Sequence, residues 1–329
     1  YKRQTIDHSS LSNFRRSLTL EMCVNLMTYV TVLFLRSGRL EKSGVFALDS
    51  TDVSVQIESY PLSRIEVSEN EFINFYGELD CDCGARRKKR DKSERFVGYR
   101  VHTLCAIDPD TKHAFPFISL AVAANHHDSQ VLSPIIDIAQ AIGLEIKVLL
   151  GDDAYADIDK KKDLLENSDI MLVTPEKEKN KKTVDGTDPS TGEVRLSTEC
   201  PLPMKWDGYD QELHGHVFVC GDENNECIFQ HRCEKEKYIP LDSGAFGPIP
   251  KCVELGQAPL DLRKVAERPF NLMKHMDGME PCRMRRKSSV TAQVTFSHIA
   301  GIMKVMAGQR SQKTKQAEKR PIQKELQYA

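Results

Sequence analysis

Three acidic residues that lie far apart in the chain each stand where an apolar segment turns polar. Asp49 interrupts a β-branched, apolar run that predicts a strand, and Asp152 follows a second apolar strand signal. Glu267 lies in a later segment with helical apolar spacing. Open α/β sheets place their ligands beyond the ends of strands, whereas a single acidic residue there is usually a cap or turn residue. The combination therefore indicates a ligand site more strongly than any one member does.

Two basic residues accompany Glu267. Arg263 precedes it by four positions and Lys274 follows it by seven. At about 100° per residue all three fall on one face of a helix. This face is either part of the site or an exposed stripe of salt bridges. Pro269 lacks the N–H that a helix interior needs, so the helix kinks or begins near it.

The spacing of these charged residues resembles a family signature. Arg263, Glu267 and Lys274 fit the Arg-x3-Glu-x6-Lys pattern of the DDE transposases of bacterial insertion sequences. The first acidic block of that family resembles residues 48–51 of this chain, and the second resembles residues 151–155. All three acidic blocks are therefore present in the family's order.

The second block contains two adjacent aspartates. The family's catalytic Asp is followed three residues later by Tyr, which favours Asp152, with Tyr155, over the fallback Asp153. The chain departs from the family at Leu260, where a Tyr usually stands three residues before the Arg. Two further stretches resemble family motifs: residues 98–102 and residues 124–129.

The resemblance implies an α/β fold with a ribonuclease H-like mixed sheet flanked by helices and an insertion subdomain before the last catalytic helix. The order of the predicted elements agrees with this fold. The predicted elements are a helix over 9–35, a strand over 45–55, a β-hairpin of 96–107 and 113–123, a helix over 129–142, a strand over 145–150, a helix over 157–166, a strand over 170–174, and helices over 260–276 and 291–306. The expected domains are a helical lead-in at 1–43, the first part of the core at 44–175, a Cys-containing insertion at 176–256, the C-terminal catalytic helices at 257–308 and a basic tail at 309–329.

The resemblance also implies a chemistry. Asp49, Asp152 and Glu267 are then the catalytic residues and the ligands of two Mg²⁺ or Mn²⁺ ions, which two-metal sites hold about 3.5 to 4 Å apart. Hard oxygen ligands select such ions. One ion activates water to cut the end of the element, and the freed 3′-hydroxyl then attacks target DNA in line.

Five residues are expected to contact DNA. Arg263 and Lys274 would hold phosphates near the acidic site, Arg as a fork and Lys as a point charge. Arg100, His102 and His126 lie in the two further family-like stretches. The two histidines contact either DNA or carboxylates beside the site, or only satisfy backbone groups.

Four of the five cysteines in the expected insertion fall within 34 positions of one another. They are Cys200, Cys220, Cys227 and Cys233. In a reducing compartment four thiols so close together could bind a structural Zn²⁺ and let a small subdomain fold without a large core. Their spacing is not that of a tight zinc knuckle, which favours the alternative of free cysteines.

The chain has 329 residues and a net charge of only −2, but the charge is divided unevenly. Residues 261–329 hold fifteen Lys and Arg against six Asp and Glu. Such a segment suits a polyanion such as DNA, or else it is a solvated tail. The composition, 40% hydrophobic and 29% charged, is that of a globular protein, and no apolar segment reaches the roughly 20 residues that a membrane span needs.

Ten cysteines and the lack of a signal-peptide pattern predict reduced thiols and a cytoplasmic location, which in a bacterium would be at the nucleoid. The sequence begins with Tyr1 rather than Met, so we expect that an N-terminal portion is missing.

Three functions stay open at this point. The first is a DNA transposase that acts as a homo-oligomer on the ends of its element and on target DNA. The second is a metal-dependent nuclease on the same fold, which would use the same three carboxylates. The third is a non-catalytic DNA-binding remnant of a transposase, in keeping with the departures from the family pattern.

Overall fold

A computed structural model describes most of the chain. The described residues are 7–37, 44–54, 63–69, 71–75, 83–87, 95–108, 112–175, 184–188, 191–222, 227, 234–241, 250, 252, 262–275, 279 and 286–325. Two positions singled out in the sequence, Leu260 and Cys233, lie outside them.

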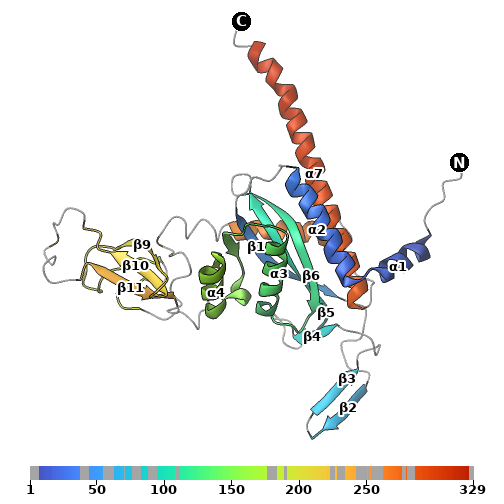
Figure 1. Cartoon of the computed structure of the whole chain (residues 1–329), viewed down its shortest axis with the longest axis horizontal. Coiled ribbons are helices and arrows are strands. Elements are labelled where there is room, and N and C mark those ends of the chain that lie inside the picture. The colour runs from blue at the N-terminus through green and yellow to red at the C-terminus, as the bar shows by residue number, and fades with distance from the viewer. Residues whose placement is uncertain are drawn as a thin grey trace.

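A mixed β-sheet forms the centre of the molecule (Figure 1). Its strands are β1 (Val45–Ser54), β4 (Gly84–Arg87), β5 (Arg95–Asp108), β6 (His113–Ala123), β7 (Val148–Leu150) and β8 (Met171–Val173). β5 pairs antiparallel with β1, β4 and β6, whereas β7 and β8 extend the sheet parallel to β1. The order β6-β5-β1-β7-β8 is that of a ribonuclease H-like sheet, so the predicted fold class is confirmed.

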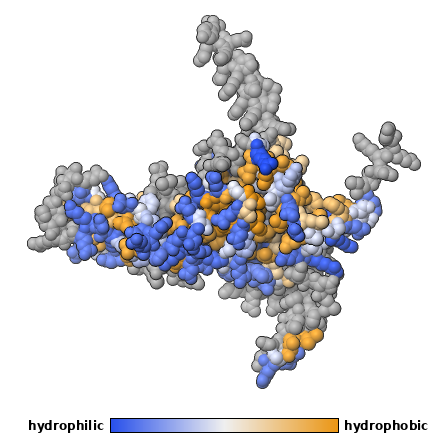
Figure 2. All heavy atoms as spheres, viewed as in Figure 1, coloured by the Kyte–Doolittle hydropathy of each residue, from blue (hydrophilic) through white to orange (hydrophobic). Residues whose placement is uncertain are grey.

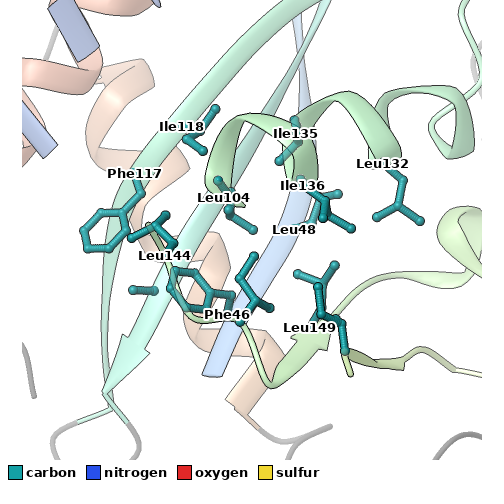
Figure 3. Close-up of a cluster of buried hydrophobic side chains, with 14 of the residues drawn as sticks. Phe46, Leu48, Leu104, Phe117, Ile118, Leu132, Ile135, Ile136, Leu144 and Leu149 are labelled. Atoms are coloured by element: carbon teal, nitrogen blue, oxygen red, sulfur yellow. The ribbon is translucent and has the colours of Figure 1, made fainter. Parts of the chain in front are cut away.

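Helices cover both faces of this sheet. They are α1 (His8–Ser17), α2 (Leu20–Arg36), α3 (Ser129–Ala141), α4 (Ile158–Ser168), α6 (Glu267–His275) and α7 (Lys287–Glu325), with the single-turn 3₁₀ helices η1 (Asp153–Tyr155) and η4 (Lys264–Ala266). On one face, Phe46 and Leu48 of β1 pack with Leu132 and Ile136 of α3 in the largest apolar cluster (Figure 3). On the other face, strand residues pack with α6 and α7.

The alternation of β1 decides which face each of its polar residues joins. Val53 packs with Met273 of α6 and Val294 of α7, whereas Leu48 packs with α3. Successive side chains of a strand point to opposite faces. Asp49 therefore shares the face of α6 and α7, and Ser50 shares the face of α3.

A separate three-stranded sheet lies within the expected insertion (Figure 1). It consists of β9 (Lys205–Asp210), β10 (Gly215–Val219) and β11 (Glu236–Pro240). The sheet has a small apolar core made by Val194, Met204, Phe218 and Ile239. Glu166 of α4 joins it to the main sheet by accepting a hydrogen bond from the Tyr209 hydroxyl (3.2 Å).

The structure agrees with most predicted elements and refines two of them. The predicted helix over 9–35 is two helices, α1 and α2, which meet at 94° because Leu18 and Thr19 are extended and Thr19 caps α2 through its hydroxyl. The predicted helix over 291–306 is the middle of the longer α7. A hairpin of β2 (Ser63–Ser68) and β3 (Glu71–Phe75) lies in a stretch that was not expected to hold strands. The domain boundaries stay a prediction.

Within the described part of the chain, no helix by itself has the length and apolar character of a membrane span, and only α1 and α2 taken as a bent pair reach them. Hydrophobic residues gather on the surface over α2 and α7, whereas the end that holds α4 and β9–β11 is mostly hydrophilic (Figure 2).

Candidate active site

Asp49 and Asp152 lie at one edge of the central sheet, at equivalent positions on neighbouring strands. The parallel pairing of β1 with β7 ends where Ala47 stands opposite Leu150. Each Asp lies two residues further along the chain than its strand's last paired residue. A carboxylate oxygen of Asp152 also accepts a hydrogen bond from the N–H of Ala154 (2.9 Å) and so caps η1. The two predicted aspartates are therefore neighbours.

The segment that carries Glu267 reaches the same edge of the sheet. Arg263 directly precedes η4, and Glu267 is the first residue of α6. Between them Ala266 packs in an apolar cluster with Ala47 and Leu150, the last paired residues of β1 and β7. This contact brings the third acidic residue to the strand ends, although it is more than a hundred residues from the second.

Pro269 stands in the first turn of α6, where backbone N–H groups have no helical partner in any case. The interpretation that the helix begins near Pro269 is therefore confirmed. Lys274 lies half-buried near the end of the same helix.

The charges of these residues act on Asp49. Its pKa is raised to about 6, chiefly because the side chain is buried, and the negative charges of Asp152 and Glu267 add to the rise. The backbone N–H of Ser50, which donates to Oδ1 of Asp49 at 2.8 Å, and the charge of Arg263 act in the opposite direction. The charges of Asp152 and Glu267, the other two acidic residues predicted from the sequence, thus both reach Asp49.

The chemistry of this donor set fits a divalent cation. Carboxylate oxygens are the ligands that Mg²⁺ and Mn²⁺ prefer, and a bound cation would relieve the repulsion that raises the pKa of Asp49. Across the described residues, no three His, Cys, Asp or Glu side chains converge closely enough to hold an ion together. Of the three proposed ligands, Glu267 is exposed, whereas Asp49 and Asp152 are half-buried.

His102 lies inside the protein and has no surface to offer DNA, since its exposed fraction is 0%. Its Nδ1 is 2.8 Å from the hydroxyl oxygen of Tyr155, and its Nε2 is 4.0 Å from a carboxylate oxygen of Asp128. Burial, with the charges of Arg100 and His126, lowers the pKa of His102 to about 3. His102 thus lies beside a buried carboxylate, and its role at the site stays a prediction.

Arg100 also binds groups within the protein. Its Nε donates to the hydroxyl oxygen of Ser50 (2.9 Å), and its Nη1 forms an ion pair with Asp128 (2.8 Å). His126 is exposed in the turn after β6. The DNA contacts of His126, Arg100, Arg263 and Lys274 stay predictions.

Sequence reasoning assigned no role to Ser50, Asp128 or Tyr155. Asp128 and Tyr155 are buried, and burial raises the pKa of both side chains. The sequence did contain a signal for these residues, because all three lie within the stretches that resemble family motifs. The contacts of these three side chains depend on how β1, β5 and β7 pair, and the motifs contain no information on that pairing.

The described cysteines of the insertion are free thiols. Cys200, Cys220 and Cys227 are each half-buried, and the thiol of Cys200 points to the carbonyl oxygen of Leu202 (3.5 Å). The fourth predicted ligand, Cys233, lies outside the described residues. The zinc site therefore stays a prediction.

Comparison with known families identifies the class of protein. A family model described as "Transposase DDE domain" matches residues 41–238, and the chain belongs to this family. The matched range contains Asp49 and Asp152, whereas Glu267 lies beyond its end. Members of this family generally use divalent metal ions.

Among solved structures, the chain is similar to a piggyBac transposase in a synaptic complex with hairpin DNA. The two share 10% sequence identity with a TM-score of 0.36, and the match covers 82% of this chain and 49% of that one. This chain thus spans about half the length of the transposase. A comparison with curated proteins gives no match.

Proposed function

We propose that this chain carries the catalytic site of a DNA transposase, which cuts DNA at the ends of its element and joins the freed 3′-hydroxyl to target DNA. One observation carries the proposal. Asp49, Asp152 and Glu267 come from three distant parts of the chain to one edge of a ribonuclease H-like sheet, and the negative charges of Asp152 and Glu267 both act on Asp49. The family match supports the same reading.

In this proposal the three carboxylates hold two Mg²⁺ or Mn²⁺ ions. Such ions, when bound, stabilise the charge on the attacking and leaving oxygens at phosphorus. Arg263, whose charge already reaches Asp49, binds a DNA phosphate beside the carboxylates. Lys274, near the end of the helix that Glu267 begins, adds a second positive charge for the same DNA strand.

We propose DNA as the partner at two places, the ends of the element and the target. The fifteen Lys and Arg of residues 261–329 suit a phosphate backbone, and α7 carries many of them away from the sheet (Figure 1). Binding should therefore weaken steeply as salt rises. A homo-oligomer on DNA, an origin in a bacterial insertion sequence and a location at the nucleoid complete the proposal.

The test is a cleavage and strand-transfer assay on duplex DNA that carries the ends of the element, with Mg²⁺ or Mn²⁺. The wild-type chain is compared with its Glu267→Gln variant, which keeps the size of the side chain and removes its charge. We expect metal-dependent cutting and joined products from the wild type and neither from the variant. Cutting without joined products would indicate a nuclease, and DNA binding without any cutting would indicate a non-catalytic remnant.

A further inference from the structure

The sheet itself does not fix the separation of Asp49 and Asp152. In the described strands, the pairing of β1 with β7 ends at Ala47 and Leu150, so each carboxylate stands beyond the last backbone bridge between its strands. Two like charges at that place repel each other. Other groups must hold the two chain segments together.

Ser50 and Tyr155 belong to the same backbone segments as the two aspartates. The N–H of Ser50 donates to the carboxylate of Asp49 (2.8 Å). The N–H of Tyr155 donates to the carbonyl of Asp152 (3.1 Å), and the N–H of Ala154 donates to the carboxylate of Asp152 (2.9 Å). Any bond between the side chains of Ser50 and Tyr155 therefore ties one aspartate segment to the other.

Five side chains close a ring at this place, on the α3 face of the sheet. Arg100 Nε lies 2.9 Å from the Ser50 hydroxyl, which also hydrogen-bonds to the Tyr155 hydroxyl. The Tyr155 hydroxyl lies 2.8 Å from Nδ1 of His102. Nε2 of His102 faces a carboxylate oxygen of Asp128 at 4.0 Å, and that oxygen lies 2.8 Å from Nη1 of Arg100.

One arrangement of protons satisfies the bonds that lead from Arg100 to Nδ1 of His102, whereas Nε2 of His102 and the carboxylate oxygens of Asp128 have no hydrogen-bond partner among the described residues. Arg100 can only donate, so Ser50 accepts from it and donates its own proton to Tyr155. Tyr155 then donates to Nδ1 of His102, which leaves the single proton of the neutral imidazole on Nε2. That nitrogen is the one that faces Asp128. The hydrogen bonds therefore run in one direction from Arg100 through Ser50 and Tyr155 to His102, and such chains of hydrogen bonds strengthen one another. Arg100 closes the ring on its other side through the ion pair with Asp128.

Three of the five ring members are buried. Tyr155 and His102 are 0% exposed and Asp128 is 2% exposed, whereas Ser50 and Arg100 are half-buried. Tyr155 also packs directly against Gly151, because a Cβ at that glycine would lie 3.2 Å from the Cβ of Tyr155. A larger residue than glycine beside Asp152 would push the tyrosine away from the strand end.

We propose that Arg100, Ser50, Tyr155, His102 and Asp128 form a positioning ring that sets the separation and orientation of the carboxylates of Asp49 and Asp152 from the opposite face of the sheet. The five are positioning residues, which act through the two aspartates. The consequence for metal binding rests on the proposed function. The mechanical consequence, a fixed η1 turn, does not.

The mechanical consequence is tested by hydrogen exchange on the metal-free chain. Tyr155→Phe removes the hydroxyl and both of its bonds but keeps the aromatic ring on Gly151. Ser119→Ala is the matched control, since it removes a buried hydroxyl that lies 2.8 Å from Nδ1 of a different histidine, His298. We expect the amides of residues 151–156 to exchange at least about 10-fold faster in Tyr155→Phe and unchanged in Ser119→Ala. Unchanged exchange in Tyr155→Phe, or equal acceleration in both variants, would overturn the proposal.

The consequence for metal binding is measured on the same proteins by calorimetric titration with Mn²⁺ alone. Loss of a group that orients a metal ligand typically weakens binding about 10- to 100-fold, and we expect that loss in Tyr155→Phe and none in Ser119→Ala. Equal Mn²⁺ affinity in Tyr155→Phe and wild type would contradict the ring's role at the site. A wild-type chain that binds no Mn²⁺ would count against the proposed function, while the exchange experiment would still decide the ring.

Discussion

Two buried histidines in this protein have almost the same immediate chemistry but different connections. His102 and His298 are both 0% exposed, both have a pKa lowered to about 3 by burial, and both have Nδ1 2.8 Å from a hydroxyl oxygen. The bond of His102 leads through Tyr155 to the segments that hold Asp49 and Asp152. The bond of His298 leads elsewhere.

His298 belongs to a short polar chain between α7 and the sheet. Its Nδ1 meets the hydroxyl of Ser119 in β6, which in turn meets the hydroxyl of Thr103 in β5 (2.9 Å). The Nε2 atoms of both histidines are buried without a hydrogen-bond partner among the described residues, but that of His102 lies 4.0 Å from a carboxylate oxygen of Asp128. This chain fixes a helix on a sheet, whereas the ring around His102 closes on itself beneath two carboxylates. Burial and a lowered pKa are therefore not enough to identify a functional histidine. The residues to which its hydrogen-bond partners are connected distinguish the two cases.

The largest expected effect on activity comes from changing a carboxylate above the ring around His102, because the surroundings of His298 contain no such carboxylate of the proposed site. Asp152→Asn removes the charge of a proposed metal ligand. It should therefore reduce the rate of DNA cleavage by more than roughly 100-fold, which is the loss expected when a residue that only orients a metal ligand is removed. Asp153→Asn, one residue away and exposed, should retain most of the activity. The measurement is the rate of metal-dependent cleavage. Equal losses in the two variants would contradict the assignment of Asp152.

The next effect compares two replacements of His102. His102→Asn places a carbonyl oxygen near the position of Nδ1, where it can still accept from Tyr155, whereas His102→Leu cannot accept any hydrogen bond. We expect kcat to fall about 10- to 100-fold in His102→Leu and much less in His102→Asn, with KM for DNA unchanged in both. Equal activity of the two variants would show that the histidine only fills space.

Replacing His298 is expected to lower stability and to leave the activity unchanged. His298→Ala leaves a cavity beneath α7 and should lower the free energy of unfolding by about 2 to 4 kcal/mol, measured by urea unfolding. Its cleavage rate and Mn²⁺ affinity, measured well below its unfolding temperature, should equal those of the wild type. A selective loss of Mn²⁺ affinity in this variant would remove the distinction between the two histidines.

The smallest effect is one that both histidines share. Each has a folded-state pKa of about 3 against an ordinary value of 6.5. Between those values the unfolded chain binds one more proton per histidine, so stability rises with pH and falls as pH drops from 6.5 toward 3. Each histidine contributes a slope of up to about 1.4 kcal/mol per pH unit in that range.

The matched variants for this slope are His298→Asn and His102→Asn, neither of which titrates there. In each, the free energy of unfolding measured between pH 6.5 and 5 should fall less steeply than in the wild type, and by a similar amount. A slope that does not change in one of them would show that its histidine is not held neutral in the folded chain.

The sequence by itself determined most of the elements of the core and selected the three candidates for the acidic site. Turn residues between two apolar runs predict the hairpin of β5 and β6, and apolar spacing predicts α3, because local backbone preference and one-sided burial leave their mark on neighbouring residues. Asp49, Asp152 and Glu267 could be selected because each stands at a break in such a pattern.

Only the tertiary structure decided how these residues meet. The ladder between β1 and β7 gives Asp49 and Asp152 equivalent positions, and the packing of Ala266 on the strand ends adds Glu267. The ring around His102 draws its members from β1, β5, η1 and the turn before α3. Such contacts depend on strand register and on which face of the sheet a residue joins, and these are properties of the packed chain that no local stretch of sequence contains.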